Sequence, residues 1–397
     1  MDNETETPVV LTLGRERLSV EREVFVALFH NSVVSNRAPV RRALAGKSLS
    51  LKTFLKLSRE AEIPYPLFFA PLDAVEEQVR VKTEKLMAGF TKSSFSMSSR
   101  HRVELRDIEL IVKDLLRKQE LLRRYDRSLV KNDFVGLTKG SRKPVIEDAR
   151  RIAEALELDL TAIRKPRSKE DALQVLVRQL EAKQILVSQS TRLHMPQLLD
   201  DVKFSGITLK DKKVPFIFLA SGDEGEGFEP AGRRVFTLML LTVLIAQGTF
   251  APVKYEGHTR DDESPRAHEI AAELLMPTAE MRTLEFSDLD SVVAAGNKFK
   301  VTPSAIVMRA RRLRHIDYDT FSAFMDELER NRLGNQSGPR SQPLPVRALK
   351  KYNGIECSRR MLGLLEAGRI NPADFRRIVL LNKVPATQIA DFRAEVG

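Results

Sequence analysis

The sequence predicts a multidomain α+β protein that is mostly helical, with one small β-sheet. The length of 397 residues is enough for two to four domains. Apolar residues recur mainly at helical spacing, whereas strand-like patterns occur at 185–187, 204–209 and 214–220. Hydrophobic residues make up 42% and charged residues 30% of the chain, which is typical of a globular protein.

Short helices are expected over residues 19–75. Ser48 and Ser50 suit an N-cap position in front of a helical run, and Pro64 and Pro66 end that segment. The pattern therefore predicts a small helical region at the amino end.

The rest of the chain alternates between helices and a few strands. The expected helices cover 104–125, 145–156, 168–183, 236–246, 267–277, 302–313, 357–368 and 371–382. Three of them begin with a residue suited to cap a helix, namely Ser168, Thr302 and Asn371. The apolar run 236–246 has about half of the ~20 residues that a membrane span needs, so a buried helix is expected there and no membrane association.

Charge and cysteine content limit the compartment and the partners. Cys357 is the only cysteine, so the chain can form no internal disulfide, and a reducing cytoplasm is expected. The first ten residues are acidic and polar, unlike a secretory signal. The net charge of +11 favours acidic partners, DNA first, although a basic surface without a specific partner stays an alternative.

The stretch AHEIAAELLMP, residues 267–277, begins like a zinc-binding helix. The His-Glu-x-x-His pattern places two imidazoles on one helix face, with the Glu as general base. Here His268 and Glu269 are present, but Ala272 stands at the second His position. A site built from His258, Glu263 and His268 is conceivable without being favoured by the spacing.

The surroundings of this stretch resemble the ImmA/IrrE family of metallopeptidases. The resemblance rests on the order FSGITL, VPFIFLA, RRVFTLMLLTVL, AHEIAAELLMP and VTPSAIVMRARRL, and it covers about residues 200–315. It implies a zincin-like domain with a small β-sheet, in which the zinc helix is the one beginning at Phe236. His268 then takes the place of an Asn that is not a ligand.

When the family's zinc ligands and general base are carried over to this chain, none of their positions holds the family's His or Glu. The two zinc His positions fall on Leu240 and Leu244, the general-base Glu on Leu241, and the third ligand on Ser264. Leucine offers no lone pair to a metal. The resemblance therefore implies a packed domain without zinc, cofactor or peptidase activity.

Residues 35–69 resemble the second half of a lambda-repressor-like helix-turn-helix domain. The resemblance rests on a recognition helix with Gly46 at its end, a turn, a further helix and an apolar exit, and it implies DNA contact. The candidate DNA-binding residues are Asn36, Arg37, Arg41, Arg42 and Lys47. Phe25 and Phe29 stand where the repressor pattern has small residues, so a helical cap with merely solvated arginines is the alternative.

Together these patterns predict five segments. They are a repressor-like domain (1–75), a helical connector (76–165), an ImmA/IrrE-like pseudo-peptidase domain (166–333), a linker (334–345) and a small C-terminal helical module (346–397).

The expected function is regulatory. We expect a catalytically inactive protein that binds DNA, a partner repressor or toxin, or both, and controls transcription of a mobile element or a two-gene module. The rival is an active metallopeptidase with relocated ligands such as His258, Glu263, His268 and Glu273. A third hypothesis is a structural interaction protein that binds no DNA.

Overall fold

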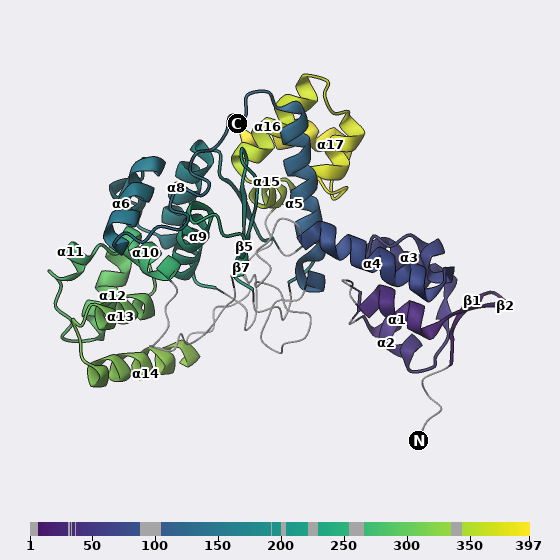
Figure 1. The fold of residues 1–397 in the computed structure, drawn as a ribbon, viewed down its shortest axis with the longest axis horizontal. Helices are drawn as coiled ribbons and strands as arrows, with labels where there is room; N and C mark the ends of the chain where they lie inside the picture. The colour runs from purple at the N-terminus through teal and green to yellow at the C-terminus, as the bar shows by residue number, and fades with distance from the viewer. Residues whose placement is uncertain are drawn as a thin grey trace. The chain divides into compact units, whose positions relative to one another are not determined.

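The structure is a computed structural model of the 397-residue chain. It describes residues 7–30, 32, 34–35, 37–87, 105–191, 193–199, 204–220, 229–253, 266–334 and 344–397. Over these residues the protein is α+β and mostly helical, as predicted (Figure 1). The chain forms two compact units, Met1–Asp114 and Leu115–Gly397, and the boundary falls inside one long helix. The five predicted segment boundaries stay predictions.

The first unit combines a small sheet with short helices. Its strands are β1 (Val9–Leu13), β2 (Glu16–Val20) and β3 (Leu49–Ser50), in the order β2-β1-β3. Its helices are α1 (Arg22–His30), α2 (Ala38–Leu44), α3 (Leu51–Glu60), the 3-10 turn η1 (Tyr65–Phe69), α4 (Leu72–Met87) and the first half of α5 (Leu105–Tyr125). Ser50 caps α3, because its side chain accepts a hydrogen bond from the Thr53 N–H at 3.2 Å.

The sequence reasoning missed the antiparallel hairpin formed by β1 and β2. The strands pair from Val9 opposite Val20 to Leu13 opposite Glu16, and Gly14 with a positive φ lies in the turn. The apolar, β-branched run from Val9 to Leu13, followed by Gly14, was the available signal. It is weak because Leu13 and Leu18 are exposed, so the outer half of the hairpin has no buried face.

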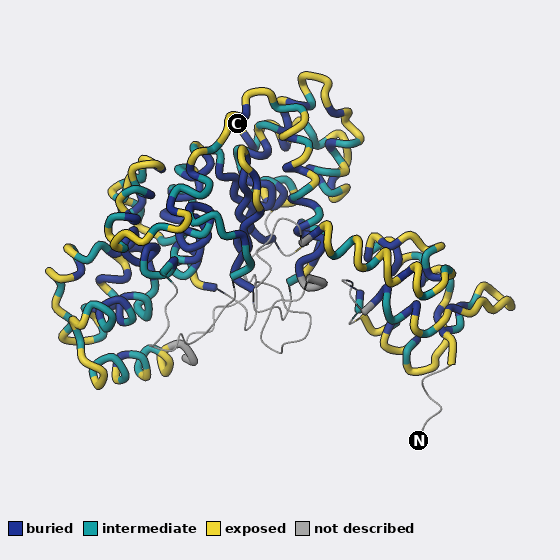
Figure 2. Tube along the Cα trace, in the orientation of Figure 1, coloured by how far each residue is buried: buried dark blue, intermediate teal, exposed yellow. Residues whose placement is uncertain are grey.

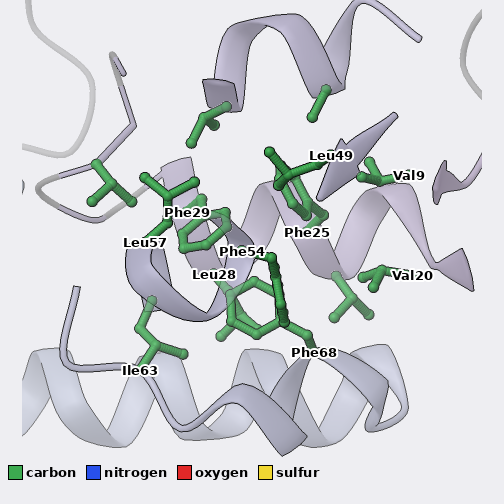
Figure 3. Close-up of a cluster of buried hydrophobic side chains, with 14 of the residues drawn as sticks. Val9, Val20, Phe25, Leu28, Phe29, Leu49, Phe54, Leu57, Ile63 and Phe68 are labelled. Carbon is green, nitrogen blue, oxygen red and sulfur yellow. The ribbon is translucent and has the colours of Figure 1, made fainter. Parts of the chain in front are cut away.

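Four phenylalanines form the centre of the first unit (Figure 3). Phe29 lies 4.9 Å from Phe25 and 4.7 Å from Phe68 between ring centroids, and Phe54 lies 4.9 Å from Phe68. These rings come from α1, α3 and η1, so edge-on and tilted aromatic contacts join the three elements. Phe25 and Phe29, which depart from the repressor pattern, are therefore the core of this unit.

The second unit surrounds a four-stranded sheet with helices. Its strands are β4 (Leu186–Gln189), β5 (Gly206–Leu209), β6 (Phe216–Leu219) and β7 (Pro252–Val253), in the order β4-β6-β5-β7. β5 and β6 form the predicted antiparallel hairpin, with Ile207 opposite Phe218. β4 pairs with β6 in parallel.

The helices of the second unit follow the predicted pattern and add several more. They are the second half of α5, α6 (Val145–Leu156), α7 (Leu160–Arg164), α8 (Lys169–Ala182), α9 (Ala231–Ala246), α10 (Arg266–Leu275), α11 (Thr278–Met281), α12 (Leu289–Lys298), α13 (Pro303–Arg312), α14 (Tyr318–Gly334), α15 (Pro345–Asn353), α16 (Ile355–Glu366), α17 (Pro372–Ile378), the 3-10 turn η3 (Ala386–Gln388) and α18 (Ile389–Val396). The predicted caps are confirmed, since the side chains of Ser168, Thr302 and Asn371 accept hydrogen bonds from the N–H groups three residues later. No helix among the described residues is long and apolar enough to cross a bilayer.

α9 lies at the centre of the second unit. It packs against β5 and β6 and against the helices α8 and α10 (Figures 1 and 2). Twelve of its sixteen residues are buried. A helix that is apolar on nearly every side is stable only where other elements cover it all round, and the burial predicted for the run 236–246 is confirmed.

The C-terminal helices attach to the same unit through β4. The Ser188 hydroxyl donates a hydrogen bond to the Tyr352 carbonyl, and Glu181 at the end of α8 accepts the N–H of Glu356 at 3.3 Å. Gly354 joins α15 to α16 with a φ of +80°, and a Cβ there would lie 2.5 Å from Glu181 Oε1. The close approach and the left-handed backbone therefore both require glycine.

The Glu181 contact predicts how stability depends on pH. Burial raises the pKa of Glu181 to about 7 from 4.5, because the charged carboxylate is desolvated. The folded state then binds this proton more tightly than the unfolded state. The contribution to stability is complete below pH 4.5 and is lost as the pH rises through about 7.

Glu181→Gln removes this titration. We expect the difference in the free energy of unfolding, variant minus natural chain, to increase by about 1.4 kcal/mol per pH unit between pH 4.5 and about 7. Urea unfolding at a series of pH values measures the difference, with Glu366→Gln on the exposed face of α16 as control. A difference that does not change with pH would contradict the assignment.

Candidate functional site

The candidate DNA-binding residues lie on and beside α2. Val40 and Ala43 bury one face of this helix, while Arg41 and Arg42 are exposed in its last turn. Pro39 near the helix start has the φ that a helix needs, and cations in the last turn complement the helix dipole. The local sequence therefore turns the two arginine side chains away from the phenylalanine core.

The candidates on either side of α2, Arg37 and Lys47, are also exposed. Arg37 lies just before α2 and forms a long ion pair of 4.0 Å with Glu60, while Lys47 follows the turn after α2. Asn36 lies outside the described residues. Within the described part of the chain, Arg41, Arg42 and Lys47 have no ion-pair partner.

Further cations on this unit were not singled out from the sequence. They are Arg15 and Arg17 on the β1–β2 hairpin and Lys52, Lys56 and Arg59 on α3, and all five are exposed. The missed hairpin explains why Arg15 and Arg17 were overlooked. The first unit therefore exposes more cations than those on and beside α2.

The positions that the resemblance assigns to zinc lie on α9 inside the core. Leu240 and Leu241 are buried and Leu244 is half-buried, whereas Ser264 lies outside the described residues. Leu241 packs against β5, since a Cβ added at Gly206 would lie 2.7 Å from Leu241 Cδ1. A fully buried leucine contributes about 1.5–3 kcal/mol to stability. Leu241 therefore fills space between α9 and the sheet.

The residues at these positions do not fit a zinc ion. Zinc needs nitrogen, sulfur or oxygen donors, and the three leucine side chains have none. Elsewhere in the described ranges, no three His, Cys, Asp or Glu side chains lie close enough together to hold a metal. Of the relocated ligands considered above, His258 and Glu263 lie outside the described residues.

His268 lies on α10 in a half-buried position against α9. Its ring centroid is 6.4 Å from that of Phe236, and its Nδ1 atom is buried without a hydrogen-bond partner among the described residues. Burial, and to a lesser extent the charge of Arg312, lowers the pKa of His268 to about 4. The imidazole is therefore neutral near pH 7.

Glu273 is held in a buried ion-pair network. Its carboxylate pairs with Arg309 on α13 and accepts hydrogen bonds from the Thr278 N–H at 3.1 Å and the Thr278 hydroxyl at 2.5 Å. Arg309 also donates to the Met276 carbonyl at 3.3 Å. Both charged side chains are buried, so the network satisfies groups that would otherwise be costly to bury. Its contacts give Glu273 a structural role that joins α10 to α13.

No protein-family profile, curated protein or solved structure matches this chain. The interpretation of both regions therefore rests on their own geometry and chemistry.

Breaking the buried pair should destabilise the second unit strongly. We expect Glu273→Gln to cost about 3–5 kcal/mol in the free energy of unfolding, because it leaves Arg309 buried without its counter-charge. Glu273→Leu combined with Arg309→Met should cost less than the sum of the two single changes. Urea denaturation of the natural chain, Glu273→Leu, Arg309→Met and the double variant measures this coupling, and additive costs would rule out the pair as the link between α10 and α13.

Proposed function

We propose that the protein is a DNA-binding regulator that contacts DNA through α2 and its neighbours in the first unit. The observation that carries the proposal is the set of exposed cations Arg41, Arg42 and Lys47 without acidic partners among the described residues. Exposed guanidinium groups are suited to hydrogen-bond phosphate oxygens and guanine edges. The net charge of +11 favours an acidic partner for the chain as a whole.

The local arrangement supports α2 as the contacting helix. α1 and α2 are joined by a short segment, and Val40 and Ala43 hold α2 against the core while its arginines face outward. In helix-turn-helix proteins the second helix of such a pair lies in the major groove. The core of Phe25, Phe29, Phe54 and Phe68 would then provide a rigid support for α2.

We further propose that the second unit acts without proteolysis. The support is chemical, because Leu240, Leu241 and Leu244 cannot bind zinc or act as a base, and two of them are packed in the core. In this proposal the unit binds a partner protein such as a repressor or toxin. The chain then controls transcription, in a mobile element or a two-gene module, through DNA contact and partner binding.

The DNA contact can be tested by removing two charges. We expect the natural chain to shift a duplex taken from upstream of its own coding sequence, and Arg41→Ala combined with Arg42→Ala to weaken binding by about tenfold or more. The slope of log affinity against log salt concentration should fall by about 2, because up to two phosphate contacts are lost. Titrations by fluorescence anisotropy at several salt concentrations provide both quantities.

The matched control is Arg369→Ala combined with Arg377→Ala, two exposed arginines of the second unit that carry the same charge. An equal loss of affinity in this control would mean that the effect depends on net charge alone and would contradict a contact through α2. No binding of any duplex by the natural chain at low salt would favour the third hypothesis, a structural interaction protein.

A further inference from the structure

Strand β2 is the edge strand of the sheet in the first unit. In the strand order β2-β1-β3 it pairs with β1 on one side, and no other described strand lies on its second side. Glu16, Arg17, Leu18 and Ser19 are all exposed, and the hairpin extends beyond the helices of this unit (Figures 1 and 2). Such an edge presents backbone N–H and C=O groups that can pair with another strand.

The backbone groups on the open edge belong to Arg17 and Ser19. Residues 14 and 15 form a two-residue turn, and in such a hairpin the pair beside the turn, here Leu13 and Glu16, exchanges both hydrogen bonds. Every second residue of β2 from Glu16 onward therefore directs its N–H and C=O to β1, and the two residues between them direct theirs away. These outward groups have no other backbone hydrogen bond in the described part of the chain.

A row of leucines crosses the sheet and ends at this edge. Leu49 of β3 pairs with Leu11 of β1, and Leu11 pairs with Leu18 of β2. Paired residues lie on the same face of a sheet, so all three side chains face the core of the unit. Leu49 and Leu11 are buried there, whereas Leu18 is 43% exposed. The apolar row therefore stops at a leucine with no neighbour on its outer side among the described strands.

β2 can pair with an antiparallel copy of itself along its full length in one register, which is centred on Leu18. There Leu18 lies opposite Leu18 of the second copy, and Arg17 lies opposite Ser19, so the residues with outward backbone groups exchange hydrogen bonds. The next registers that keep each face on its own side pair only three of the five residues. One of them also places Arg17 opposite Arg17 of the second copy, which is unfavourable.

The register centred on Leu18 is also complementary in charge. No two like charges lie directly opposite each other in the paired strands, because Glu16 faces Val20 and Arg17 faces Ser19. Arg15, in the turn before β2, comes opposite Glu21 of the second copy, just before α1. Both residues are exposed, and the symmetry of the pairing produces this contact twice.

We propose that the first unit binds a second copy of this chain by pairing β2 with β2 across a two-fold axis. The result is one continuous sheet in the order β3-β1-β2-β2-β1-β3, in which the leucine row runs unbroken through both copies. The two-fold symmetry closes the contact, so pairing stops at the dimer. This surface is separate from the cations on and beside α2, and the proposal does not depend on DNA binding.

Sedimentation velocity of the full chain over a range of concentrations tests the dimer. We expect the natural chain to reach the mass of two chains, and Leu18→Lys to raise the dissociation constant by about tenfold or more, because it places two like charges opposite each other. Leu13→Lys is the matched control, since Leu13 is 54% exposed, lies on the same face and receives the same charge on β1. Its dissociation constant should change by less than about threefold, because salt screens a charge at that distance.

Disulfide cross-linking tests the register independently of any effect on affinity. Opposite residues of a non-hydrogen-bonded antiparallel pair have Cα atoms about 4.5 Å apart, which is within the range of a disulfide. With oxidised glutathione as the oxidant, Leu18→Cys should form a covalent dimer about tenfold faster than Arg17→Cys or Ser19→Cys. Cys357 is buried and is present in all three variants, so it does not account for a difference between them.

Three results would overturn the proposal. The first is a natural chain that keeps the mass of one chain up to about 100 μM, which would leave the edge of β2 to a strand from a different protein. The second is a Leu18→Lys variant that dimerises as tightly as the natural chain. The third is faster cross-linking through Arg17→Cys or Ser19→Cys than through Leu18→Cys, which would show that the leucine row is not continuous.

Discussion

The second unit depends on the burial of α9 on nearly all of its sides. β5 and β6 cover one side of this helix, and α8 and α10 cover others. Such a position admits polar groups only where they are paired, as Arg234 is with Glu170 and as the Thr242 hydroxyl is with the Leu238 carbonyl at 2.8 Å. Leu240 and Leu241 are buried apolar side chains and need no polar partner. The helix therefore has a packing role at the positions where the resemblance would place catalytic groups.

The first unit builds its buried core around aromatic rings. Phe25, Phe29, Phe54 and Phe68 join α1, α3 and η1 in one cluster, which leaves the short helix α2 to be held by Val40 and Ala43. Half-buried Leu44 also packs against this cluster, while Arg41 and Arg42 of α2 are exposed. Both units thus separate a strongly apolar interior from a charged exterior.

Sequence reasoning succeeded where the signal was local. Ser168, Thr302 and Asn371 each marked a helix start, because capping depends on residues only three positions apart. It missed the β1–β2 hairpin, in which exposed Leu13 and Leu18 weaken the signal. It also could not bring the first turn of α9 against the start of α13, where a Cβ at Gly232 would lie 2.6 Å from the Val301 carbonyl carbon. The assignment of Arg41 and Arg42 to DNA stays a prediction.

The central claim is that the α9–α10 region works without a metal. Elemental analysis of the full chain, purified without chelators and after zinc supplementation, tests it most directly. The account predicts far less than one zinc per chain and an unchanged melting temperature after chelator treatment. One zinc per chain that is lost in His268→Ala would contradict it and favour a peptidase with relocated ligands.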